Sequence, residues 1–209
     1  MEDMGDDLYS RVLHTNNNEL ELYKLAIEVV EALPVEADVP EYTTQKLIDE
    51  SLLFIDWFAP EAPRDEFITI MRGILGQLDN SKKILVLRDY HADNLMWMPK
   101  REGLNKVGLL DFQDALIGNV AYDYVSLLED ARRDVSPETV AKILHNKSDS
   151  FLRDYAILGA QRNLKIIGIF HRLNKRDGKA RYLDYLPRVW GHMNNDLRHP
   201  ALLKLKIWM

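Results

Sequence analysis

Eight prolines divide this 209-residue chain into segments of helical length, and this division limits its fold more than any other feature. Between the prolines, apolar residues recur every three or four positions, which is the spacing of one helix face. Because proline cannot continue a helix, each proline marks a boundary. We therefore expect a mainly helical protein, with helices over 17–33, 43–58, 64–78, 122–133, 136–146, 151–174 and 182–197, the last of them interrupted or reoriented at Pro187.

One stretch in the middle of the chain has a different pattern. Residues 83–88, 94–98 and 106–110 are short apolar runs, and a turn that contains Pro99 and Gly103 separates the last two. Such runs predict a strand, a loop and then a small antiparallel hairpin. The expected fold class is therefore mainly α (α+β), with helices around one small β element that holds loops in place.

Composition excludes several kinds of protein. The chain has no cysteine, which excludes disulfides, thiol catalysis and cysteine-built zinc sites. Its net charge of -6 argues against a nucleic-acid partner. No apolar run approaches the length of a membrane span, and the acidic start does not resemble a signal peptide. We expect one cytoplasmic domain over residues 1–209, long enough to bury its own core.

The polar residues that could carry chemistry gather on the loops of the β element. Asp89 and Asn94 follow the first strand, and Asp111 follows the last strand of the hairpin. A phosphoryl-transfer site needs one carboxylate to accept a hydroxyl proton, and a second carboxylate and an amide oxygen to hold Mg²⁺. Asp89 suits the first task, and Asn94 and Asp111 suit the second. Asp and Asn are also common turn residues, so a purely structural role for them is the alternative.

Four sequence blocks resemble one enzyme family. They are Arg88-Asp-Tyr-His-Ala-Asp-Asn-Leu, Leu110-Asp-Phe-Gln-Asp-Ala, the segment 122–135, and Gly159-Ala-Gln-Arg-Asn-Leu-Lys. Together they resemble the aminoglycoside phosphotransferase/choline kinase-like family, which has a protein-kinase-like fold. The blocks look closest to the bacterial cell-wall amino-sugar kinases, which phosphorylate the anomeric hydroxyl of N-acetylmuramate and N-acetylglucosamine. Leu87-Arg88 stands where the aminoglycoside enzymes have His-Gly, and this departure favours the amino-sugar branch.

The resemblance implies roles for individual residues and implies ATP and Mg²⁺ as cofactors. Asp89 matches the catalytic base, and Asn94 and Asp111 match the metal ligands. Met96 matches the apolar residue beneath the adenine ring, and Met4 lies in a hinge-like start over residues 1–12 that would also contact the nucleotide.

Further residues match positions around these. Asp123 matches a buried aspartate that holds the backbone of the catalytic loop, which is a structural task. The candidates for binding a small amino-sugar acceptor are His91, Asp93, Gln113, Asp114 and Arg133. Each of these candidates would also suit an ordinary loop or helix end. The domain then divides into the hinge-like start, the catalytic and metal loops at 83–114, and a helical substrate and packing region at 120–209.

The same resemblance shows what the chain does not contain. A complete enzyme of this kind has an amino-terminal β lobe with a glycine-rich phosphate loop and a strand lysine. Neither pattern occurs here, so the chain matches a carboxy-terminal lobe, and we expect it to turn over poorly by itself. We also expect an exposed apolar patch near residues 1–12 and 94–98, which could receive a separate amino-terminal lobe or a second copy.

Three functions are consistent with the sequence. The first is an ATP-dependent amino-sugar kinase, which the intact Asp89, Asn94 and Asp111 favour. The second is a catalytically impaired pseudokinase or binding module, which the missing phosphate loop favours. The third is a kinase of an aminoglycoside or a choline-like alcohol, against which the replaced His-Gly counts.

Overall fold

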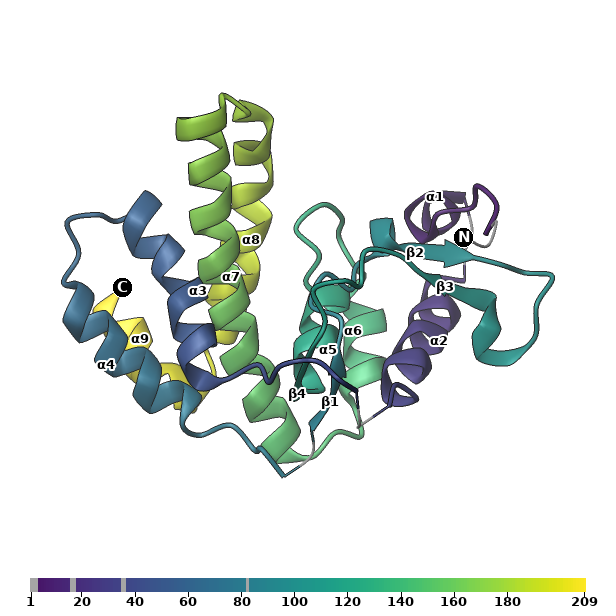
Figure 1. The fold of residues 1–209 in the computed structure, drawn as a ribbon, viewed down its shortest axis with the longest axis horizontal. Coiled ribbons are helices and arrows are strands. Elements are labelled where there is room, and N and C mark those ends of the chain that lie inside the picture. Colours follow the sequence, from purple (N-terminus) through teal and green to yellow (C-terminus); the bar gives the residue numbers. More distant parts are fainter. Residues whose placement is uncertain (1–3, 16–17, 35–36, 82) are drawn as a thin grey trace. The chain divides into compact units, whose positions relative to one another are not determined.

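The computed structural model describes residues 4–15, 18–34, 37–81 and 83–209. Its backbone is mostly helical, with two small antiparallel sheets (Figure 1). The predicted fold class is therefore confirmed. The first three residues of the hinge-like start lie outside the described residues.

The chain folds into two compact units made of interleaved segments. The first unit comprises Met1–Glu41, Ser81–Asp130 and Val135–Lys147, and the second comprises Tyr42–Asn80, Ala131–Asp134 and Ser148–Met209. The single domain over 1–209 stays a prediction. All the strands described belong to the first unit, which also holds the polar loops.

The first unit combines helices with both sheets. Its elements are α1 (Tyr9–Thr15), α2 (Glu19–Glu31), β1 (Lys83–Val86), the 3₁₀ turn η1 (Ala92–Asn94), β2 (Leu95–Trp97), η2 (Gly103–Lys106), β3 (Val107–Leu109), β4 (Leu116–Asn119), α5 (Ala121–Leu128) and α6 (Pro137–Leu144). Strands β2 and β3 form the predicted hairpin, in which Met96 lies opposite Gly108.

Strand β4 was not predicted, and it changes the sheet topology. It pairs antiparallel with β1, so β1 belongs to a second sheet and does not extend the hairpin. The expectation of one β element was therefore wrong. Leu116-Ile-Gly-Asn is short and contains a glycine, and these features weaken the sequence signal of a strand. The two sheets nevertheless place the loop after β1 and the loop after β3 in the same unit.

The second unit is helical. Its elements are α3 (Thr44–Trp57), α4 (Arg64–Leu75), α7 (Asp149–Asp177), η3 (Ala180–Tyr185), α8 (Leu186–Asp196), η4 (Pro200–Leu202) and α9 (Leu203–Trp208). Helix α7 lies beside α3 and α8 (Figure 1). At Gly168 of α7 the backbone of α3 approaches so closely that a Cβ atom would lie 2.2 Å from the carbonyl carbon of Leu53.

Two helix ends carry the residue types that favour them. The Ser136 side chain caps α6 by accepting a hydrogen bond from the amide of Thr139, and Pro137 occupies the first turn. Helix α7 ends at Gly178, which has a φ of 66°, and the Gly178 amide donates to the carbonyl of Asn174.

Some helix boundaries differ from the predicted ones, and two short helices were not predicted. Helix α5 ends at Leu128, five residues before the predicted end, because Glu129 leaves helical geometry with a ψ of 45°. Residues 182–185 form part of a 3₁₀ turn, and α8 begins at Leu186, next to the proline where an interruption was predicted. The short helices α1 and α9 were missed, because helices of 7 and 6 residues show too few turns for a periodic pattern.

The predicted apolar patch near residues 1–12 and 94–98 does not appear in the described residues. Tyr9, Leu95 and Met96 are buried. Leu8 bridges to Met96, and the amide of Trp97 donates to the carbonyl of Asp7 at 2.7 Å, so the start of the chain covers strand β2.

A matched pair of helical glycines tests the packing of the second unit. We expect Gly168→Ala to destabilise the chain by about 2–3 kcal/mol, because the added methyl group would overlap with backbone atoms of α3. Gly191→Ala, in α8, meets nothing within 4 Å and should stabilise the chain by about 0.5–1 kcal/mol. Urea unfolding measures both changes, and equal effects at the two sites would contradict this packing.

Candidate functional site

Two loops of the first unit carry the predicted chemistry. The 87–94 loop joins β1 to β2 and contains Asp89 and Asn94, and the 110–115 loop joins β3 to β4 and contains Asp111. The amide of Leu110 donates to the carbonyl of Asn94 at 3.0 Å. This hydrogen bond joins the end of one loop directly to the start of the other.

The buried carboxylate of Asp123, on α5, holds the start of the 87–94 loop. Its two oxygens accept hydrogen bonds from the backbone amides of Leu87 at 2.7 Å and Arg88 at 2.9 Å. One turn further along α5, the hydroxyl of Ser126 donates to the carbonyl of Arg88 at 2.7 Å. Helix α5 therefore holds both the amide and the carbonyl of Arg88, the residue immediately before Asp89.

Tyr90 anchors the same loop to α2. Its ring is buried, and its hydroxyl donates to the carbonyl of Ala26 at 2.8 Å. Burial raises the pKa of Tyr90 well above its usual value, and the negative charge of Asp123 raises it further. The hydroxyl therefore stays protonated and remains a donor, so Asp89 projects from a loop that is fixed at its neighbouring residues.

The backbone is strained at one residue in each loop. Among the described residues other than glycine, the two with positive φ are Arg88, at 71°, and Asp111, at 56°. Such conformations cost about 1–3 kcal/mol each and gather at functional sites. Their occurrence next to Asp89 and at Asp111 itself is evidence that these loops are built for more than chain reversal.

The side-chain amide nitrogen of Asn94 forms a hydrogen bond inside the loop. Its Nδ2 donates to the carbonyl of Asp89 at 2.9 Å, and its backbone amide donates to the carbonyl of His91 at 2.8 Å. Because Nδ2 is fixed by that bond, the orientation of Oδ1 is also fixed. An amide oxygen held in this way is a ready ligand for a hard cation.

Asp111 is exposed, and its Oδ1 accepts a hydrogen bond from Nε2 of Gln113 at 2.5 Å. Mg²⁺ in nucleotide sites takes one or two protein carboxylates and completes its octahedron with water and phosphate. The pair of Asn94 and Asp111 fits this requirement. Among the described residues, no group of three or more His, Cys, Asp or Glu side chains could hold a metal.

Met4 and Met96 meet at Gly108. A Cβ atom at Gly108 would lie 2.6 Å from Sδ of Met4 and 3.0 Å from Cβ of Met96. The structure therefore brings together the two residues that were assigned to the nucleotide. Met96 is buried, which suits a residue that supports another group from below.

The predicted acceptor residues fall in different environments. His91 is buried, Asp93 is half-buried in η1, and Gln113 and Asp114 are exposed on the 110–115 loop. Arg133 belongs to the second unit, whereas the other four belong to the first.

Sequence reasoning missed two residues of this arrangement, Arg88 and Ser126. Ser126 follows Asp123 by three residues on α5, which places both on one helix face, and that spacing was the available signal. Arg88 lies in the first of the four sequence blocks, but the sequence contains no sign of its positive φ.

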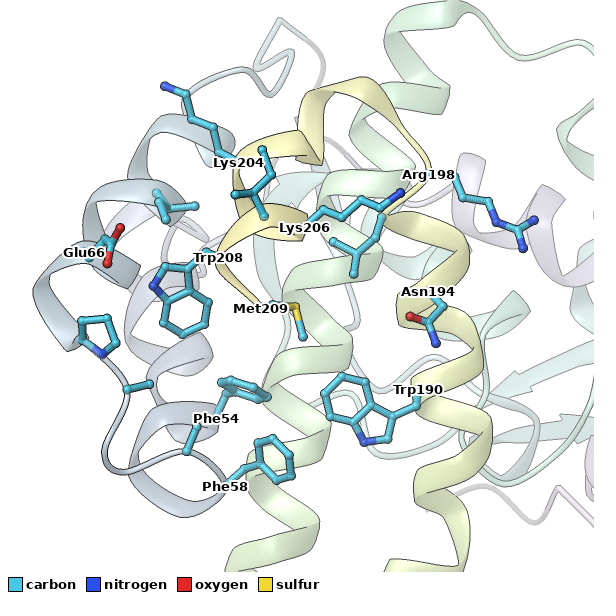
Figure 2. Close-up of a pocket in the computed structure, with 16 residues that line it drawn as sticks. Phe54, Phe58, Glu66, Trp190, Asn194, Arg198, Lys204, Lys206, Trp208 and Met209 are labelled. Carbon is cyan, nitrogen blue, oxygen red and sulfur yellow. The ribbon is translucent and has the colours of Figure 1, made fainter.

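The second unit contains a large cleft that is separate from these loops. It has a volume of about 1170 Å³ and is lined by aromatic residues that include Phe54, Phe58, Trp190 and Trp208 (Figure 2). Glu66 is the one acidic side chain in its lining, and none of the predicted site residues lines it.

Comparison with known families decides the classification. Residues 11–158, which include both loops and α5, match the model of the phosphotransferase enzyme family. The chain belongs to this family. The resemblance that was inferred from the four sequence blocks is thereby confirmed.

Two curated relatives of the chain carry the same name. The chain is 36% identical to an N-acetylmuramate/N-acetylglucosamine kinase of Caulobacter vibrioides, in a match that covers 100% of this chain and 65% of that protein. It is 31% identical to a protein of the same name in Pseudomonas putida, with 97% and 66% covered. The chain thus spans just under two thirds of the length of these relatives.

Solved structures support the fold. A putative aminoglycoside phosphotransferase from Ralstonia eutropha superposes with a TM-score of 0.59 at 13% identity, covering 86% of this chain and 64% of that one. The GDP complex of aminoglycoside 2'-phosphotransferase-IIIa gives a TM-score of 0.57 at 20% identity, covering 87% and 65%. At these identities the likeness concerns the fold alone.

The helices were also compared with the dimensions of a bilayer. Within the described part of the chain, no helix is both long enough and apolar enough to span a membrane.

Replacing the Asp123 carboxylate tests the anchoring of the 87–94 loop. In Asp123→Asn, one of the two backbone amides would face an N–H group, so we expect a loss of about 1–3 kcal/mol in unfolding free energy. Hydrogen exchange followed by mass spectrometry should show faster exchange at Leu87 and Arg88. Unchanged exchange at these two amides would contradict the role of Asp123.

Proposed function

We propose that this chain provides the proton acceptor and the metal ligands of an ATP-dependent phosphotransferase that acts on an amino sugar. The observation that carries the proposal is the pair of loops: each has one strained residue, hydrogen bonds join them, and α5 fixes the start of the 87–94 loop. The acceptor class is proposed from the relatives named N-acetylmuramate/N-acetylglucosamine kinase.

Asp89 is proposed as the general base. It is exposed on a loop whose flanking residues are fixed, so its carboxylate can reach a hydroxyl group of the acceptor. The anomeric oxygen attacks the γ-phosphorus of ATP, the bond from that phosphorus to the ADP oxygen breaks, and Asp89 takes the hydroxyl proton. Proton transfer to a positioned base contributes typically about 10²–10⁴-fold to a rate.

Asn94 and Asp111 are proposed to hold Mg²⁺. When bound, this ion neutralises charge on the phosphates. The chain's own contribution is to fix the two ligand oxygens in advance, through the Nδ2 bond of Asn94 and the Gln113 bond to Asp111. Because these ligand oxygens are already in place, no free energy is needed to order them during the reaction.

An impaired kinase or binding module is the second candidate, and one observation favours it. Phe112, next to Asp111, is 56% exposed, so an apolar side chain lies uncovered at the proposed site. A site with this surface open to water would stabilise charge poorly. We therefore expect slow turnover by the chain alone and faster turnover when a separately produced amino-terminal kinase lobe is added.

The test is a phosphotransfer assay with Mg·ATP and, in turn, N-acetylmuramate, N-acetylglucosamine and kanamycin, with and without the added lobe. We expect transfer to the amino sugars and a loss of about 10²–10⁴-fold in Asp89→Asn. Asp38→Asn, at an exposed position of the same unit, is the matched control and should keep full activity. Turnover that survives in Asp89→Asn would remove Asp89 as the base, and transfer to kanamycin alone would overturn the amino-sugar acceptor.

A further inference from the structure

Arg88 combines three features that its place in the sequence does not explain. Its φ is 71°, a conformation that glycine adopts easily and arginine does not. Its amide and carbonyl are both held by α5, through Asp123 and Ser126. A residue kept in a strained conformation from both sides, although glycine would fit there without strain, suggests that its side chain has a task.

The side chain of Arg88 reaches the other loop. Its Nη1 donates a hydrogen bond to the backbone carbonyl of Asp114 at 3.2 Å. Asp114 lies in a turn closed by the amide of Ala115, which donates to the carbonyl of Phe112 at 3.1 Å. The guanidinium therefore holds the turn that directly follows Asp111.

Charge gives this contact a second consequence. The two loops carry four carboxylates, at Asp89, Asp93, Asp111 and Asp114, and Arg88 is the one Arg or Lys in them. Like charges on neighbouring loops repel one another. The Arg88 guanidinium, which contacts the 110–115 loop, offsets part of this repulsion.

We propose that Arg88 is a positioning residue that holds the 110–115 loop against the 87–94 loop, so that the oxygens of Asn94 and Asp111 face one metal ion. The inference rests on the proposed function, because it assigns a task within the same site. The strained backbone directs the Arg88 side chain toward the 110–115 loop. Asp123 and Ser126 hold the backbone in this conformation.

Arg88→Gly separates this role from a structural one. Glycine accepts a φ of 71° without strain, and the backbone hydrogen bonds to Asp123 and Ser126 do not need the side chain. We expect unfolding at the same or a higher urea concentration, together with an affinity for Mn²⁺ that is about tenfold to a hundredfold lower. Mn²⁺ binding is measured on the full chain by water-proton relaxation, which does not depend on turnover.

Three further variants make the result decisive. Arg88→Lys keeps a cation and should recover part of the Mn²⁺ affinity, and Arg72→Ala removes an exposed arginine of α4 and should leave the Mn²⁺ affinity unchanged. Asp111→Ala should weaken Mn²⁺ binding, and if it does not, the proposed metal site itself fails. If Asp111→Ala weakens binding while Arg88→Gly binds as the wild type does, the metal site stands and the role of Arg88 is overturned. Easier unfolding of Arg88→Gly in parallel with its loss of affinity would also overturn it, in favour of a structural role.

Discussion

The buried carboxylate of Asp123 is the contact on which the site depends. It accepts hydrogen bonds from the two backbone amides directly before Asp89. It lies on a helix that follows strand β4 closely in the chain. A buried carboxylate is costly unless it is fully hydrogen-bonded. The same bonds that satisfy Asp123 therefore hold the loop in a conformation that it would not adopt alone, because Arg88 is strained there.

From this contact the rest of the arrangement follows in order. The fixed backbone at Leu87 and Arg88 sets the direction of the 87–94 loop, and Tyr90 ties that loop to α2. Asn94 then closes the loop on the carbonyl of Asp89 and joins it to Leu110. The hairpin of β2 and β3 separates the two loops in sequence and brings them together in space, which explains why a mostly helical protein contains these few strands.

Much of this could be predicted from the sequence. The long helices show clear periodicity, and their caps at Ser136 and Gly178 are where the residue types indicate. Asp89, Asn94 and Asp111 were expected on the loops that flank the hairpin, and they lie there; their chemical roles stay predictions. Strand β4 was missed because its four residues include a glycine, and α1 and α9 were missed because seven and six residues show too few helical turns. The strain at Arg88 has no sequence signal, because it results from tertiary hydrogen bonds to α5.

The central claim is that the two loops form one metal site. The most direct measurement adds Mn²⁺ with ADP to the ¹⁵N-labelled chain and follows the broadening of each amide signal by the paramagnetic ion. The account predicts that broadening is strongest at residues 89–94 and 111–114, and that it disappears from both loops together in Asp111→Ala. Broadening that affects one loop without the other, or that centres elsewhere in the chain, would contradict it.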